Sequence, residues 1–429
     1  MFSQFCALPV AGEAYLLQYG RWKALIDGGW GVRPLLRALQ PFGHPLELHA
    51  VICTHNDQDH AGGLTGLLGS PRSPKVGEFW LPGSWSSRMD DLLLRPSHFI
   101  KELRREIFEK FASDILRASE SPQLAERETI FGSEVSNTVF EALITENAGS
   151  SRELDSPHDS EQRGRHSEPQ TLAHESDWLR ILRSQVRNRA VAEELSVPPL
   201  SRIDDGQQFP LNERRKLYNV LHRSIEAAER IRAIAYQAMV YDIPIRWFDF
   251  SSFKKIGRQR GGWPYRLVPV NSRELIDPRI PGLDRLTYLA LTTVNRESLV
   301  FYFVESGHKP GALFCADSPM HFEDLPSVNW LCQFPQPELP IIVTAPHHGR
   351  CSNKSAYPYI DHWLNSEAAP IWIRAGGQLR WPCLELRRRT PRYCTQCKAS
   401  SCSTLRMQHF VSCSCHPRWL HVFGTPCRC

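Results

Sequence analysis

The most constraining feature of the chain is an apolar segment that ends in a cluster of potential metal ligands. Residues 48–54, LHAVICT, are rich in apolar and β-branched side chains, which favours a buried strand. The next six residues, HNDQDH, contain His55, Asp57, Asp59 and His60. Imidazole and carboxylate groups bind divalent metals, and a simple turn does not need four of them. The segment predicts a strand that presents a metal site at its carboxyl end.

Two further groups of potential ligands follow apolar segments much later in the chain. Asp317 ends the segment ALFCAD, whereas His347 and His348 follow the segment PIIVTA. Strand ends converge on one edge of a layered α/β sheet, so these distant ligands can meet there. Taken alone, an aspartate after a strand is more often a helix cap. The prediction that Asp317, His347 and His348 bind metal therefore depends on the stronger signal of the cluster at residues 55–60.

Apolar patterning places strands on both sides of a mostly helical region. Before that region we expect two short strands in residues 13–27 and single strands at residues 48–54 and 76–82. Strand patterns return at residues 243–250, 265–270, 286–293, 298–304, 312–317 and 340–345.

These patterns predict an α/β core in two halves, at residues 1–83 and 243–377. A helical insertion at residues 84–242 separates the halves, and a Cys-rich tail follows at residues 378–429. Within the insertion, residues 146–171 contain only two aliphatic side chains, so we expect a disordered loop there.

Composition narrows the class of protein. Apolar residues make up 41% of the chain and charged residues 23%, which is ordinary for a soluble globular protein. No apolar run approaches the roughly 20 residues that a membrane helix needs, and no signal peptide is apparent. We therefore expect a cytoplasmic protein. The net charge of +5 permits a nucleic-acid partner without arguing for one.

The tail holds eight of the 13 cysteines, between Cys383 and Cys429. Without a secretion signal, metal binding or free thiols are a better interpretation than a disulfide framework. Two half-motifs of a structural zinc site are formed by Cys394, Cys397, Cys413 and Cys415. A thiol-rich mobile tail is the alternative.

The motifs together resemble the metallo-β-lactamase fold. That family carries His-x-His-x-Asp-His at a strand end, and here Asp57 replaces the second histidine. This variant is similar to the nuclease-like domain of ComEC-type DNA-uptake proteins and their soluble relatives. The segments LIDGG, VNRESLVFYF, FCADS and PHHGR also resemble that branch. The resemblance covers about residues 10–83 and 243–377, and it implies an αββα sandwich.

The resemblance implies a dinuclear metal site and the role of each ligand. His55 and Asp57 would bind the first metal, and Asp59 and His60 the second. Asp317 would bridge the two, and either His347 or His348 would complete the second position. The metal would be Zn²⁺ or Mn²⁺, because a carboxylate at position 57 hardens the site. Asp59 would also orient the attacking water, whereas Asn56 and Gln58 should point away from the metals.

Some residues depart from the family pattern. The third metal motif lacks a histidine and shows Asn295 and Ser298 instead. Arg350 stands where a serine commonly follows His-His-Gly, and Arg374 and Trp381 replace residues near the substrate pocket.

The function implied is metal-dependent hydrolysis of phosphodiesters, with DNA as the first choice of substrate. Lys254, Lys255, Arg258 and Arg260 form a dense basic patch that we interpret as a nucleic-acid contact. Two alternatives stay open: hydrolysis of a small ester, lactone or thioester, and a metal-binding scaffold without turnover.

Overall fold

The structure is a computed structural model of the chain. It describes residues 2–120, 177–190, 211–263, 266–276, 278, 284–293, 295–304, 311–320, 330–334, 341–364, 370–376, 382–395, 405–410, 419–423 and 426–427. The expected disordered loop at residues 146–171 lies outside these ranges, as do Trp381, Cys397, Cys413 and Cys415.

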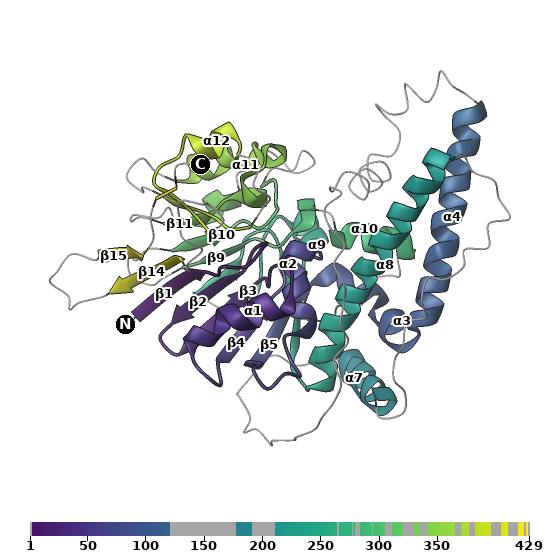
Figure 1. Cartoon of the computed structure of the whole chain (residues 1–429), viewed down its shortest axis with the longest axis horizontal. Helices are drawn as coiled ribbons and strands as arrows, with labels where there is room; N and C mark the ends of the chain where they lie inside the picture. The colour runs from purple at the N-terminus through teal and green to yellow at the C-terminus, as the bar shows by residue number, and fades with distance from the viewer. Residues whose placement is uncertain are drawn as a thin grey trace.

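Two mixed sheets form the centre of the described structure (Figure 1). The first has the order β15-β14-β1-β2-β3-β4-β5-β6-β8, and β3 to β6 run parallel. Its strands are β1 (Phe2–Ala7), β2 (Tyr15–Tyr19), β3 (Trp22–Ile26), β4 (Glu47–Ile52), β5 (Lys75–Pro82), β6 (Ile245–Asp249), β8 (Arg273–Leu275), β14 (Leu405–Phe410) and β15 (Trp419–Phe423).

The second sheet has the order β13-β12-β11-β10-β9-β7, and β10 to β13 run parallel. Its strands are β7 (Leu267–Pro269), β9 (Phe301–Phe303), β10 (Ala312–Phe314), β11 (Ile342–Thr344), β12 (Ile371–Arg374) and β13 (Arg392–Cys394). Aromatic side chains join the two sheets: the ring centroids of Phe5 and Phe314 are 5.7 Å apart, and those of Trp80 and Phe301 are 5.6 Å apart. The sheets therefore face each other across one buried core.

Helices cover the outer faces of both sheets. The α-helices are α1 (Val32–Leu39), α2 (Gln58–Ala61), α3 (Met89–Leu94), α4 (Pro96–Glu120), α7 (Asp177–Ala190), α8 (Leu211–Val240), α9 (Phe250–Ile256), α10 (Arg285–Thr293), α11 (Ala356–Trp363) and α12 (Leu384–Arg387). Short 3₁₀ helices are η1 (Gln40–Phe42), η2 (Gly62–Gly66), η3 (Gly83–Arg88), η4 (Asn295–Glu297), η5 (Trp330–Gln333), η6 (Pro346–Gly349) and η7 (Cys351–Asn353). The layers follow the order helix, sheet, sheet, helix.

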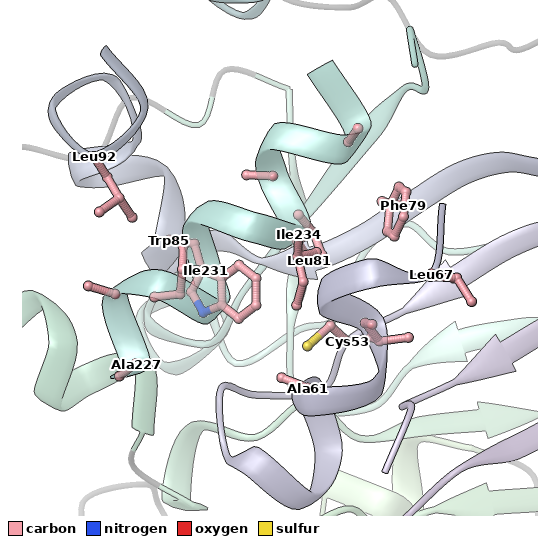
Figure 2. Close-up of a cluster of buried hydrophobic side chains, with 14 of the residues drawn as sticks. Cys53, Ala61, Leu67, Phe79, Leu81, Trp85, Leu92, Ala227, Ile231 and Ile234 are labelled. Atoms are coloured by element: carbon pink, nitrogen blue, oxygen red, sulfur yellow. The ribbon is translucent and has the colours of Figure 1, made fainter. Parts of the chain in front are cut away.

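The helices α3, α4, α7 and α8 all lie between β5 and β6 in the chain. Figure 1 shows α4 and α8 side by side, and α8 continues across the first sheet. Ala227, Ile231 and Ile234 of α8 are buried in the same apolar cluster as Leu81 of β5 (Figure 2). The residues inserted between β5 and β6 thus contribute directly to the core of the first sheet. None of the described helices is both long and apolar enough to cross a membrane.

Residues 286–293 form helix α10, so the strand expected there is wrong. The Asp284 carboxylate accepts a hydrogen bond from the Thr287 amide at 2.8 Å, which is the geometry of a helix N-cap. Leu286 and Leu289 are buried with the insertion helices, and Tyr288 donates a hydrogen bond to the Trp85 carbonyl oxygen at 3.0 Å. A short apolar run does not distinguish a strand from a buried helix, and here the cap and the helical partners decide.

The described parts of the tail join both sheets. Strand β13 pairs with β12 in parallel, and the β14–β15 hairpin pairs with β1. Residues 378–429 are expected as a Cys-rich tail, and in the structure the strands of this tail extend both sheets. The edge of β1 offers unpaired backbone groups, and β14 satisfies them.

Candidate metal centre

The three groups of predicted ligands meet where strands of the two sheets end. The loop after β4 carries His55 and Asp57 and leads into α2, which contains Asp59 and His60. Asp317 follows β10, and η6 after β11 carries His347 and His348. Because β10 and β11 are parallel neighbours, their carboxyl ends lie together, and the core packing brings them to the end of β4.

Asp317 lies between two clusters of ligand atoms. On one side, its Oδ2 is 3.7 Å from Nε2 of His55, which is itself 3.6 Å from Oδ2 of Asp57. On the other side, its Oδ1 is 3.2 Å from Nε2 of His60 and 3.9 Å from Nε2 of His348. A carboxylate with one oxygen toward each cluster has the geometry of a bridging ligand.

The two histidines of η6 face different clusters. Nε2 of His348 lies 2.8 Å from Oδ2 of Asp59, on the side of His60. Nε2 of His347 lies 3.5 Å from Oδ2 of Asp317, on the side of His55. The sequence leaves open which of them completes the second position. The geometry favours His348, and it places His347 next to the first position.

Hydrogen bonds on the far side of each imidazole leave a lone pair toward Asp317. Nδ1 of His60 is 2.8 Å from the Asp27 carboxylate, and Nδ1 of His348 is 2.9 Å from the Ala375 carbonyl oxygen. The Thr54 hydroxyl donates to Asp27, so its oxygen accepts from Nδ1 of His55 at 3.0 Å. Each Nδ1 therefore carries a proton, and in a neutral ring Nε2 does not.

The three Nε2 atoms are buried without a hydrogen-bond partner among the described residues, and so is Oδ1 of Asp317. Lone pairs and carboxylate oxygens that face one another repel unless a cation lies between them. Among the described residues, two groups are close enough to hold a metal ion: His55, Asp57 and Asp317, and Glu13, His60, Asp317 and His348. The donor set of imidazole and carboxylate fits a divalent transition metal such as Zn²⁺ or Mn²⁺.

The pKa shifts of His55, His60 and Asp317 also indicate that the site favours positive charge. Burial lowers the pKa of His55, but the nearby carboxylates of Asp317 and Asp57 outweigh it and raise the pKa to about 9. Burial also opposes the protonated form of His60, yet Asp317 and Asp27 raise its pKa well above the ordinary value. Burial would raise the pKa of Asp317, but His347 and His60 hold it well below its usual range. A metal ion satisfies the same carboxylates without these protons.

Strained backbone surrounds the ligands. His347 and His348 have φ values of 47° and 52°, and Ala316, directly before Asp317, has a φ of 46°. Left-handed conformations are costly for residues other than glycine, and they cluster at functional sites. Arg374 stabilises this arrangement, because its Nε donates to the His348 carbonyl oxygen at 2.9 Å. Arg374, which departs from the family pattern, therefore holds the backbone of η6 at His348.

Two acidic residues near the site were missed by sequence reasoning. Asp27 is fully buried and accepts hydrogen bonds from the Thr54 amide and hydroxyl, both at 2.8 Å. Glu13 is 1% exposed, and its Oε1 is 3.1 Å from Nδ1 of His348. The signal for Asp27 is in the segment LIDGG, where a carboxylate directly follows the apolar strand β3. The signal for Glu13 was a charged residue directly before the apolar strand β2.

Asn295 and Cys394 were also singled out in the sequence. Asn295, in the motif that lacks a histidine, places Nδ2 at 3.4 Å from Nδ1 of His347. Cys394 ends β13 and is buried, with its sulfur 3.7 Å from Nη1 of Arg374. The three cysteines expected to share zinc with it are outside the described residues, so the structural zinc stays a prediction.

The basic patch is exposed at the end of α9 and in the loop that follows. It consists of Lys254, Lys255, Arg258 and Arg260. Helix α9 follows β6, which is parallel to β4, so the patch begins at the same edge of the first sheet as the metal ligands. Whether it contacts nucleic acid stays a prediction.

Comparison with known proteins supports the broad resemblance. Residues 8–78 match the family model described as the Metallo-beta-lactamase superfamily. The match includes Glu13, Asp27 and the ligand cluster at residues 55–60. A search of curated proteins finds no match. The comparisons thus give no support to the narrower ComEC-like resemblance. With its two facing sheets and outer helices, the chain has a metallo-β-lactamase-like α/β fold.

Proposed function

We propose that this chain is a metal-dependent hydrolase that cleaves phosphodiesters, with DNA as the first candidate substrate. One observation carries the proposal. The Nε2 atoms of His55, His60 and His348 converge on the carboxylate of Asp317, which has one oxygen toward each cluster. This arrangement supports two divalent metal ions, Zn²⁺ or Mn²⁺, bridged by Asp317.

When bound, the metal ions lower the pKa of water and stabilise negative charge on the reacting oxygens. The residues of the chain supply position and a proton acceptor. The Asp59 side chain is 20% exposed, whereas Asp317 is 2% exposed. Asp59 thus lies beside His348 and reaches toward solvent, so its carboxylate can accept the proton of an attacking water. Burial opposes its ionisation, but His348 holds the pKa of Asp59 below the ordinary value, so the carboxylate is charged.

Two features support a phosphodiester substrate. Asp57 takes a position that the family at large gives to histidine, and an oxygen ligand there suits Mn²⁺ as well as Zn²⁺. The patch of Lys254, Lys255, Arg258 and Arg260 is exposed at the same sheet edge, where it could follow a phosphate backbone. Small esters or lactones would use the same metal centre without the patch.

The test is hydrolysis of single- and double-stranded DNA and of a generic phosphodiester in Mn²⁺ and in Zn²⁺. We expect Asp59→Ala to lower activity by at least about 10²- to 10⁴-fold, the usual effect of losing a general base. The fold should survive, because Asp59 is partly exposed at the site rather than in the apolar core. Circular dichroism and metal content would be measured for each variant.

Glu47→Ala is the control, because Glu47 is an exposed carboxylate on β4, the strand before the ligand loop, and lies 3.5 Å from the Lys75 ammonium group at the surface. It should keep wild-type activity. Full phosphodiesterase activity in Asp59→Ala would disprove the assigned role of Asp59. Hydrolysis of esters or lactones but not of phosphodiesters would replace the proposed substrate. Metal binding without any turnover would favour a scaffold.

A further inference from the structure

Arg350 is a cation at the candidate metal centre that the proposed mechanism does not use. It directly follows η6, and its Nη1 donates a hydrogen bond to Nε2 of His347 at 3.2 Å. The side chain is only partly exposed. Within the described part of the chain, no carboxylate oxygen lies within ion-pair distance of its guanidinium. A partly buried guanidinium is always charged and carries five donors, so most of its hydrogen-bonding capacity remains available.

The position of Arg350 is set by His347. Because a guanidinium only donates, Nε2 of His347 must accept, and the proton of this ring resides on Nδ1. Nδ1 in turn lies 3.2 Å from Oδ1 of Asn353 and 3.1 Å from Oγ of Ser352, which fix the ring. Nε2 of His347 thus accepts a hydrogen bond from Arg350. His347 belongs to neither group of described residues that could hold a metal ion.

Arg350 therefore lies beside the cluster of His55, Asp57 and Asp317. Nε2 of His347, which contacts the guanidinium, is also 3.5 Å from Oδ2 of Asp317, the oxygen that faces His55. An anion bound between this cluster and solvent would lie within reach of the remaining guanidinium donors. Two parallel N–H groups match two oxygens of a phosphate, and such charge-assisted pairs are stronger than neutral hydrogen bonds.

We propose that Arg350 binds the non-bridging oxygens of the substrate phosphate next to the first metal position. The inference rests on the proposed function and names the residue that selects an anionic phosphodiester over a neutral ester. A neutral ester or lactone would leave the guanidinium partly desolvated without an anion. Such unmatched charge is costly and discriminates against that substrate.

The experiment compares Arg350→Ala and Arg350→Lys with Lys354→Ala in the metal-loaded protein. Lys354 is an exposed cation in the same segment and controls for a general change in charge. For Arg350→Ala, KM for a generic phosphodiester should rise about 10- to 100-fold, as expected for lost hydrogen bonds to a charged group. Arg350→Lys keeps the charge but not the planar fork, so we expect partial recovery. Lys354→Ala should change KM less than about 2-fold.

Calorimetric titration with inorganic phosphate gives a readout that does not depend on turnover. Phosphate affinity should fall in Arg350→Ala by a factor similar to the rise in KM, with metal content unchanged. Unchanged KM and phosphate affinity would overturn the inference, as would a loss of metal that accounts for the whole effect. If Arg350→Ala does not fold, unchanged phosphate affinity in Arg350→Lys would overturn the role of the planar fork. Wild type that binds phosphate through Arg350 but hydrolyses no phosphodiester would refute the proposed function alone.

Discussion

One carboxylate, that of Asp27, organises two of the histidines at the centre. Its Oδ2 is 2.8 Å from Nδ1 of His60 and accepts the Thr54 hydroxyl, whose oxygen in turn faces Nδ1 of His55. The residue is fully buried and has a φ of 58°, so the surrounding structure holds it in a strained conformation. Such outer partners orient metal ligands and increase their basicity.

Asp27→Asn should therefore weaken metal binding. The amide lacks the charge that favours the Nδ1-protonated form of His60. Its NH₂ group would also face hydrogen-bond donors, which are the Thr54 amide and hydroxyl and Nδ1 of His60. We expect metal affinity to fall about 10- to 100-fold, the usual effect of removing such a partner. Competition with a chromophoric chelator measures this. Asp249→Asn is the control, because Asp249 is also buried at a strand end but caps α9 through the Ser252 amide. Wild-type affinity in Asp27→Asn would show that Asp27 does not control the ligands.

At the scale of elements, helix α8 holds the ligand loop from the side opposite the metals. Asn56 is fully buried, and its Nδ2 donates to the Ala227 carbonyl oxygen at 2.9 Å. Arg230 donates to the Asn56 carbonyl oxygen at 3.0 Å and to Oε1 of Gln58 at 2.9 Å. Asn56 and Gln58 thus point away from the metals, as the sequence predicts. Their partners on α8 lie 171 and 172 positions away in the chain, so the sequence does not indicate this contact.

Asn56→Ala should loosen the ligand loop. The substitution leaves the buried Ala227 carbonyl oxygen without its Asn56 donor and removes one acceptor of the partly buried Arg230. This costs about 1–3 kcal/mol of unfolding free energy. Hydrogen–deuterium exchange should become faster at residues 55–61, whereas β2 and β3 should exchange as in wild type. Gln58→Ala is the matched comparison, and it should have a smaller effect because Gln58 is only partly buried. Equal exchange in wild type and Asn56→Ala would contradict the role of α8.

Across the whole molecule, a buried ionic network joins the insertion to the second half of the core. Arg285 of α10 donates to Oδ2 of Asp91 at 2.6 Å and to Oε1 of Glu106 at 3.1 Å. Its guanidinium also lies 5.6 Å from the ring centroid of Phe99. Asp91, Phe99 and Glu106 all belong to α3 and α4 of the insertion. The network thus fixes how α3 and α4 lie against α10.

Arg285→Met should destabilise the protein by about 3 kcal/mol, because breaking a buried ion pair leaves an uncompensated charge. Asp91 keeps a contact with Arg95 at 3.0 Å, which places the effect at the lower end of the usual range. Urea unfolding followed by fluorescence measures the loss. Arg105→Met is the control, because Arg105 pairs with Glu102 and Glu109 at the surface and should cost less than about 1 kcal/mol. Equal midpoints for the two variants would rule out a stabilising role for the buried network.

The sequence by itself determined the features that depend on neighbouring residues. The strand at β4, the ligand cluster after it and the ligands after β10 and β11 are all local patterns of apolar and polar residues. Such patterns also indicated that the insertion at residues 84–242 is helical. Metal chemistry could be inferred because the side-chain types alone restrict what a cluster such as His55 to His60 can bind.

Only the tertiary structure decided what depends on distant partners. Residues 286–293 are helical because Asp284 caps them and the insertion helices receive their apolar face. The tail strands are parts of the sheets because β1 and β12 offer them edges. The roles of Asp27 and Arg350 were hidden because a hydrogen bond depends on direction and distance. Residues far apart in the chain acquire these only when the two sheets come together, so no local pattern can encode them.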